Sequence, residues 1–137
     1  MTSSHFSAQD DRSIRARQRT EPPRALPLHD AGTAWKTADK VREVLTTLYH
    51  DRPDGLSGNE DVGQMSAWYV LSSLGMYEVE PAGGRYWFGS PLFDRAEIAV
   101  PGGTFTIVAE NNSAENKYIQ RVWLNGQPYT KPYLWHK

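Results

Sequence analysis

Residues 55–75 read GLSGNEDVGQMSAWYVLSSLG, which is a glycine-rich acidic stretch followed by a largely apolar one. Its second half carries apolar side chains nearly all round a helix, which predicts a helix over residues 63–74 that ends at Gly75. One amide and two acidic residues lie immediately before that helix: Asn59, Glu60 and Asp61. The stretch therefore predicts a helix buried on several sides, with an acidic cluster at its amino end.

A second helix is expected before this stretch. Apolar residues recur at the spacings i, i+3, i+4, i+7 and i+8, namely at Val41, Val44, Leu45, Leu48 and Tyr49. This spacing is one stripe of an amphipathic helix, for which Thr37 is the expected N-cap. Because one stripe cannot cover a helix that is apolar all round, the chain has more apolar helix surface than it can bury by itself.

After Pro81 the spacing of apolar residues changes from that of a helix to the two-residue alternation of a strand. Four segments alternate as strands do: residues 85–89, 96–100, 104–110 and 118–126. Pro101-Gly102-Gly103 and Asn125-Gly126 are turn sequences, and Asn125-Gly126 is a strong signal for a tight hairpin. The sequence therefore predicts an α+β chain whose second half is an antiparallel sheet in need of a partner layer.

The beginning of the chain has a different composition. Residues 1–20 contain only three large apolar side chains, and residues 21–34 are rich in proline. We expect a disordered or extended lead-in over residues 1–31, because so little apolar surface cannot offset the entropy of ordering the backbone. A helical segment over residues 32–76 and an antiparallel β segment over residues 77–137 follow it.

The composition limits the classes of function. The chain has 137 residues, no cysteine, and a net charge of -1 from 15 basic and 16 acidic residues. Disulfides and thiolate metal sites are excluded, and nothing favours nucleic acid or a membrane as a partner. The four histidines lack metal-ligand spacing, and from the sequence we expect no signal peptide and no membrane-spanning segment in this chain. We expect a soluble chain of undetermined localisation.

The acidic cluster has two interpretations. Asp61 followed by Gln64 has the spacing of a capping box, in which Asp61 would only start the helix. Capping requires one acceptor, however, and does not account for Asn59, Glu60 or three flanking glycines. A carboxylate held near a helix amino end can also accept a proton from water or bind a metal. An EF-hand is excluded, because the loop lacks ligands at alternate positions. Both interpretations stay open from the spacing alone.

Four segments carry a resemblance to a known family. They are WKTADKVREVL (residues 35–45), PDGLSGNEDVGQMSAWYVLSSLGMY (53–77), GSPLFD (89–94) and FTIVAENNSAENKYIQRVWLNG (105–126). The chain from about Gly32 to His136 resembles the C-terminal part of glycoside hydrolase family 92. These enzymes are calcium-dependent exo-acting α-mannosidases that invert the anomeric configuration.

The resemblance implies a fold and a place in it. The family joins a β-sandwich to an (α/α)6 barrel, and the sugar binds where the two meet. The two helices would be the last of that barrel, and the strands would close the chain against the sandwich. The expected partners are therefore α-mannosides or mannose-containing glycans, together with the missing N-terminal portion of the enzyme.

The resemblance also implies roles for individual residues. Asp61 matches the position of the family's general base, while Asn59 and Glu60 would position the water and the substrate. The family's general acid lies upstream, and no residue within 1–20 resembles its motif. We therefore expect a C-terminal fragment that is inactive by itself, since an inverting glycosidase needs two carboxyl groups.

Calcium is the cofactor that the resemblance implies. Glu21, in Thr20-Glu21-Pro22, is the candidate ligand, although Thr20 stands where the family has Asn. Two alternatives to an enzyme part remain. One is a carbohydrate-binding remnant that stacks sugars on Trp35, Trp68 or Trp87, and the other is a truncated pseudogene product that folds poorly.

Overall fold

The computed structural model describes residues 12–19, 34–80 and 82–136. Its helices are α1 (Ala34–Thr47) and α2 (Gln64–Ser73). Its strands are β1 (Arg12–Arg19), β2 (Met76–Tyr77), β3 (Arg85–Phe88), β4 (Arg95–Val100), β5 (Gly103–Glu110), β6 (Tyr118–Leu124), β7 (Gln127–Tyr129) and β8 (Tyr133–Trp135). The α+β class predicted from the sequence is confirmed.

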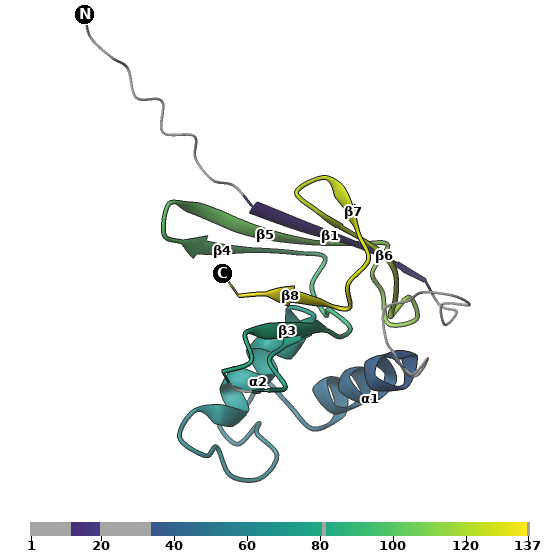
Figure 1. The fold of residues 1–137 in the computed structure, drawn as a ribbon. Coiled ribbons are helices and arrows are strands. Elements are labelled where there is room, and N and C mark those ends of the chain that lie inside the picture. The colour runs from purple at the N-terminus through teal and green to yellow at the C-terminus, as the bar shows by residue number, and fades with distance from the viewer. Residues whose placement is uncertain (1–11, 20–33, 81, 137) are drawn as a thin grey trace, which may run out of the picture.

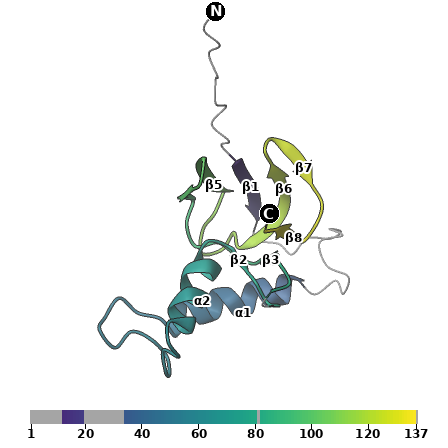
Figure 2. The same cartoon turned by 60° about the vertical axis from the view of Figure 1, so that its left-hand side comes forward.

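The strands form two sheets. The larger sheet has the order β4-β5-β1-β6-β7, and the smaller has the order β2-β3-β8 (Figure 1). Every pairing is antiparallel except that of β1 with β5, which is parallel. The core lies between the sheets and contains Ile14, Ile107, Val122, Met76 and Leu134. In both views the smaller sheet lies between the larger sheet and the helices (Figure 2).

Helix α2 has the predicted bounds. Gly63 is its N-cap, Leu74 its C-cap, and Gly75 follows with φ 87°. A Cβ at Gly75 would lie 2.9 Å from Pro91, so this position needs glycine for both conformation and space. The predicted burial on several sides is wrong, because α1 and the smaller sheet cover only part of α2. Only Ser72 and Ser73 of the helix are buried, and Val70 is 56 % exposed.

Helix α1 begins one turn earlier than predicted. Thr37 lies inside the helix and is not its N-cap, because Ala34 and Lys36 favour the helix and nothing before Thr37 interrupts it. The predicted apolar stripe is confirmed in part. Leu45 is buried, whereas Leu48, which follows the helix, is 45 % exposed.

The strands predicted in the second half are confirmed within two residues at each end. Asn125 and Gly126 have φ values of 50° and 77°, as expected for a tight hairpin turn between β6 and β7. Strands β2 and β8 were not predicted. They have two and three residues, which is too short for a period of two to be visible.

Strand β1 corrects the prediction of a disordered lead-in. Residues 12–19 lie in the centre of the larger sheet, and their inward side chains Ile14, Ala16 and Gln18 are 5, 7 and 0 % exposed. Counting large apolar residues missed this alternation, because a small residue and an amide fill two inward positions. Arginines fill the outer positions, where Arg15 pairs with Glu110 at 2.7 Å. The remainder of the expected lead-in lies outside the described residues.

Gln18 offers a test of this strand. Its side chain is fully buried, and neither Oε1 nor Nε2 has a hydrogen-bond partner among the described residues. An unpaired buried amide costs about 1–3 kcal/mol. We expect Gln18→Leu to raise the free energy of unfolding by about 1–2 kcal/mol in urea denaturation. The exposed Gln127→Leu should change it by less than about 0.5 kcal/mol. Loss of stability in Gln18→Leu would contradict this position for β1.

Helix α1 is attached to the connection between β5 and β6, residues 111–117, through Arg42. This side chain is only 9 % exposed. Its Nη2 donates to the Pro91 carbonyl at 2.6 Å, to Ser90 Oγ at 3.0 Å and to Asn112 Oδ1 at 3.1 Å, and its Nη1 donates to the Ser113 carbonyl at 3.4 Å. Burial lowers the pKa of the Arg42 guanidinium. The amino-terminal part of the connection is thus fixed to α1.

Asp39, almost one helical turn before Arg42, holds the other end of the connection. Its Oδ1 lies 2.6 Å from Lys117 Nζ and accepts a hydrogen bond from the Tyr118 hydroxyl at 2.7 Å. The hydrogen bond from Lys117 keeps the pKa of the Asp39 carboxyl below its ordinary value, and the same bond raises the pKa of Lys117. One helix therefore fixes both ends of the β5–β6 connection.

Candidate functional site

The acidic cluster lies in the connection between α1 and α2, residues 48–63, called the acidic loop below. In both views this loop projects away from the two sheets (Figures 1 and 2). A hydrogen bond from His50 N to the Gly55 carbonyl at 2.9 Å closes a tight turn over residues 50–55. A Cβ at Gly55 would lie 1.8 Å from the His50 carbonyl oxygen, so only glycine fits there. The first half of the loop is therefore tightly constrained.

The carboxyl end of the acidic loop, next to α2, contains three consecutive residues in the left-handed conformation. Asp61, Val62 and Gly63 have φ values of 54°, 58° and 92°. Aspartate and glycine adopt this conformation readily, but a β-branched residue does so rarely. The cost for Val62 is about 1–2 kcal/mol, and its side chain is fully exposed, so no burial offsets it. Strain of this kind concentrates at functional sites.

The capping-box interpretation of Asp61 and Gln64 is wrong. Gly63 is the N-cap, and as a glycine it has no side chain with which to cap the helix. Asp61 contributes only its main-chain carbonyl, which accepts from Gln64 N at 3.3 Å, because the left-handed turn separates its carboxylate from the helix amides. Glu60 Oε1 lies nearest to a capping role and accepts from Ser66 N at 3.4 Å. The exposed carboxylate of Asp61 is therefore not explained by helix capping.

An aromatic group adjoins the acidic loop. Tyr49 stacks on Trp68 with a centroid separation of 5.6 Å and lies 4.9 Å from the Tyr69 ring. We call Tyr49, Trp68 and Tyr69 the aromatic cluster. Burial, and then the charge of Glu60, raises the pKa of Tyr49. Glu60 Oε2 is itself buried without a hydrogen-bond partner among the described residues. Sequence reasoning assigned Tyr49 to the helix stripe and missed this contact, because the helical spacing continues past the residue where α1 ends.

The three tryptophans named as stacking surfaces lie on different elements. Trp35 is on α1 with Lys36 Nζ 5.5 Å from its ring, and Trp68 is on α2 against Tyr49. Trp87 is on β3, edge to face with Tyr133 at 5.1 Å. Of the three, the contacts place Trp68 beside the acidic loop.

The structure does not supply a calcium site from its described residues. Within residues 12–19, 34–80 and 82–136, no three His, Cys, Asp or Glu side chains gather closely enough to hold a metal ion. Glu21 lies outside these ranges, so its role stays a prediction. We assign no chemical step to the ion. In the same ranges no helix is long and apolar enough to cross a membrane.

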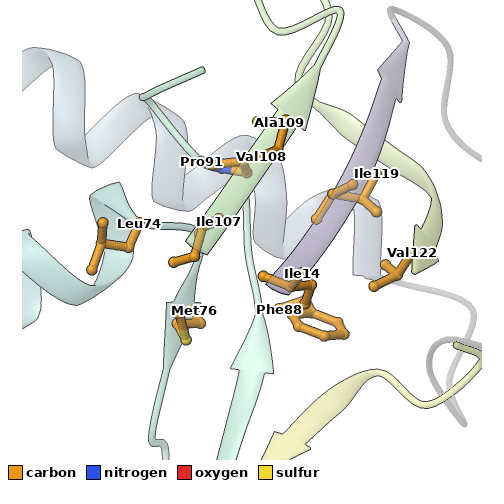
Figure 3. A pocket seen from close by; sticks show the side chains of 12 residues that line it. Ile14, Leu74, Met76, Phe88, Pro91, Ile107, Val108, Ala109, Ile119 and Val122 are labelled. Carbon is orange, nitrogen blue, oxygen red and sulfur yellow. The ribbon is translucent and has the colours of Figure 1, made fainter. Parts of the chain in front are cut away.

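A hollow between the two sheets is unrelated to the acidic loop (Figure 3). Its lining includes Ile14 and Ile107 from the larger sheet and Met76 and Phe88 from the smaller. None of the lining residues is ionisable. The hollow is therefore a feature of the apolar core and not a catalytic pocket.

The strain at Val62 can be measured. We expect Val62→Gly to raise the free energy of unfolding by about 1 kcal/mol, because glycine adopts a positive φ without a steric penalty. Val79→Gly is the matched control, since Val79 is also exposed (65 %) but has no positive φ. Val79→Gly should leave the free energy of unfolding unchanged or lower it in the same urea titration. Equal effects of the two substitutions would contradict backbone strain at Val62.

Comparisons with known proteins agree with the resemblance. Residues 20–137 match the model of the glycosyl hydrolase family 92 catalytic domain. A relative described as an uncharacterized secreted glycosidase of Arthroderma benhamiae is 31 % identical over 113 residues. That match covers 80 % of this chain and 14 % of the relative.

Solved structures give the same result. A family 92 α-mannosidase of Bacteroides thetaiotaomicron in complex with mannoimidazole is 36 % identical with a TM-score of 0.71. A family 92 inverting mannosidase of Bacteroides thetaiotaomicron is 43 % identical with a TM-score of 0.68. Each match covers 75 % of this chain and only 14 % of the solved chain. The chain therefore belongs to glycoside hydrolase family 92 and spans a small part of the length of its relatives.

Proposed function

We propose that this chain is the C-terminal part of an inverting exo-α-mannosidase in which Asp61 is the general base. The observation that carries the proposal is the carboxylate of Asp61, which is exposed next to the strained Val62 and takes no part in capping α2. A solvent-accessible carboxylate that has no structural task and adjoins a strained residue is suited to chemistry.

In this mechanism Asp61 accepts a proton from a water molecule as the water oxygen attacks the anomeric carbon. The bond from that carbon to the leaving oxygen breaks, and a second carboxyl group protonates the leaving oxygen. In inverting enzymes the two carboxyl groups are about 6.5–9.5 Å apart, which leaves room for the water. The second group would come from the portion of the enzyme that this chain does not contain.

Neighbouring residues would position the water and the sugar. Glu60 Oε2 is buried without a hydrogen-bond partner among the described residues, so a movement of the loop that exposed this oxygen would let it accept from a sugar hydroxyl or a water. Asn59, also exposed, can donate and accept. The aromatic cluster offers apolar ring surface of the kind that sugars stack on. The family match makes a terminal α-linked mannose the proposed substrate of this site.

The exposed surface of α2 supports a place at the end of a helical barrel. Val70 is 56 % exposed, and Leu48 and Leu56 before the helix are 45 % and 39 % exposed. A helix with apolar side chains on several sides is normally covered by neighbours. Further helices of an (α/α)6 barrel would cover this surface in the complete enzyme.

The test is complementation. The 43 % identical Bacteroides mannosidase, truncated to lack the part that this chain covers, is mixed with this chain and assayed on an aryl α-mannoside. We expect neither half to be active, the mixture to be active, and proton NMR to detect β-mannose as the first product. A soluble mixture that is inactive, or that releases α-mannose first, contradicts the proposal.

A second candidate is a carbohydrate-binding remnant without turnover, which the stack of Tyr49 on Trp68 beside the acidic loop favours. Under this alternative, mannose changes the tryptophan fluorescence of the isolated chain, and the change survives in Asp61→Ala. Binding of this kind in a mixture that never hydrolyses the substrate would favour the second candidate over the first.

A further inference from the structure

Strands β5 and β6 are consecutive in the chain but do not pair with each other. β1 lies between them, parallel to β5 and antiparallel to β6, so β5 and β6 are antiparallel (Figures 1 and 2). Antiparallel strands that follow one another usually form a hairpin. Here a strand-wide space separates them, which we call the strand slot.

The strand slot is held open by residues within the family match. Arg42 binds Asn112 and Ser113 at one end of the β5–β6 connection. Asp39 binds Lys117 and Tyr118 at the other end. Both residues are on α1, so these contacts fix the two ends of the connection from outside β1; β1 adds one hydrogen bond, from Asn111 Nδ2 to the Gln18 carbonyl at 3.2 Å. The slot is therefore a property of the family domain and needs a strand to fill it.

The strand that fills the slot here lies outside the family match. β1 ends at Arg19, whereas the match begins at residue 20. The fit of β1 is imperfect at its carboxyl end. The pairing with β6 shifts register between Arg17 and Gln18, and the Gln18 side chain is buried without a partner among the described residues. These features indicate that β1 occupies a place that another strand would fit better.

We propose that the strand slot is a docking site for a β-strand from the portion of the mannosidase that this chain does not contain, and that β1 occupies it until that portion binds. The incoming strand would carry small or aliphatic side chains on the face toward Ile107, Ala109 and Val122, where β1 places Ile14 and Ala16. This inference rests on the proposed function, since it takes the missing portion of the enzyme as the partner.

Hydrogen exchange of the mixture used for complementation tests the displacement. In the isolated chain we expect amides of residues 12–19 to be protected, because they pair on both sides. In the complex their exchange should accelerate at least about tenfold. Amides of β3 and β8, which lie in the other sheet, are the internal control and should keep their protection.

Two substitutions in β1 should shift the affinity for the truncated mannosidase in opposite directions. Ala16→Asp weakens β1 and should tighten binding about tenfold, because more of the chain has a free slot. Gln18→Leu keeps β1 in place and should weaken binding about tenfold. The matched control is Arg17→Ser, an exposed β1 residue, which should leave the affinity unchanged. If Ala16→Asp does not fold, the affinity of the stabilised Gln18→Leu chain for the truncated mannosidase still tests the proposal.

The outcomes separate this inference from the proposed function. Protected β1 amides in an active mixture overturn the inference and leave the catalytic proposal standing. Released β1 amides in an inactive complex support the inference and contradict the catalytic proposal. Failure of both the wild-type chain and Ala16→Asp to bind overturns the inference. A dimer of this chain with exchanged β1 strands, seen by light scattering, would make a second copy the partner instead and overturn the proposed one.

Discussion

Asp61→Asn is expected to reduce kcat of the complemented mannosidase by about 10²- to 10⁴-fold, the usual contribution of a general base. The amide has nearly the shape of the carboxylate but cannot accept the proton of the attacking water. Since Asp61 makes no side-chain contact with the helix amides, the fold and the KM should change little. Steady-state kinetics on an aryl α-mannoside, with circular dichroism of the variant, measures both.

Asp54→Asn is the control for this experiment. Asp54 is an exposed aspartate of the same acidic loop, and its substitution removes the same charge. We expect activity within about twofold of wild type, because salt screens the effect of an exposed surface charge on the reaction. Equal losses in the two variants would show that loop charge, and not proton transfer at Asp61, limits the rate.

Arg42→Ala is expected to lower the free energy of unfolding by about 3–5 kcal/mol. The substitution leaves the Pro91 carbonyl, Ser90 Oγ and Asn112 Oδ1 without the donor that now binds them. Each buried unpaired acceptor costs about 1–3 kcal/mol, and the lost side chain leaves a void besides. Urea denaturation followed by tryptophan fluorescence measures the change.

Arg95→Ala is the matched control, because the Arg95 side chain is 61 % exposed and its ion pair with Glu97 is at the surface. An exposed pair contributes about 0–1 kcal/mol. Arg42→Lys should be intermediate, since it keeps one donor group but cannot reach several acceptors at once. If Arg42→Ala and Arg95→Ala were equally mild, the attachment of α1 to the β5–β6 connection would be wrong.

The regular part of the fold was predictable because its local signals agree with its packing. Alternation located β3 to β6, and Gly75 located the end of α2. β1 was missed because its order depends on the strand slot, which only residues far along the chain create. Its arginines, judged alone, resemble a charged tail. Tertiary context, and not local propensity, orders these eight residues.

The candidate site was predictable in composition but not in geometry. Spacing located the acidic cluster, and the family resemblance selected Asp61 within it. The capping interpretation failed because no sequence rule predicts three successive left-handed residues that include Val62. Tyr49 was missed because a stripe at helical spacing gives no warning that α1 ends before its last apolar residue.

The attachment of α1 also limits how this gene can vary in length. Asp39 and Arg42 are three residues apart, and each reaches a different end of the same connection. One inserted residue between them would turn everything after it by about 100° and advance it by about 1.5 Å. The guanidinium would then face away from Asn112, and the β5–β6 connection would lose one of its two attachments to α1. Insertions and deletions within this single helical turn should therefore be eliminated by selection, even where substitutions on the exposed side of the helix are accepted.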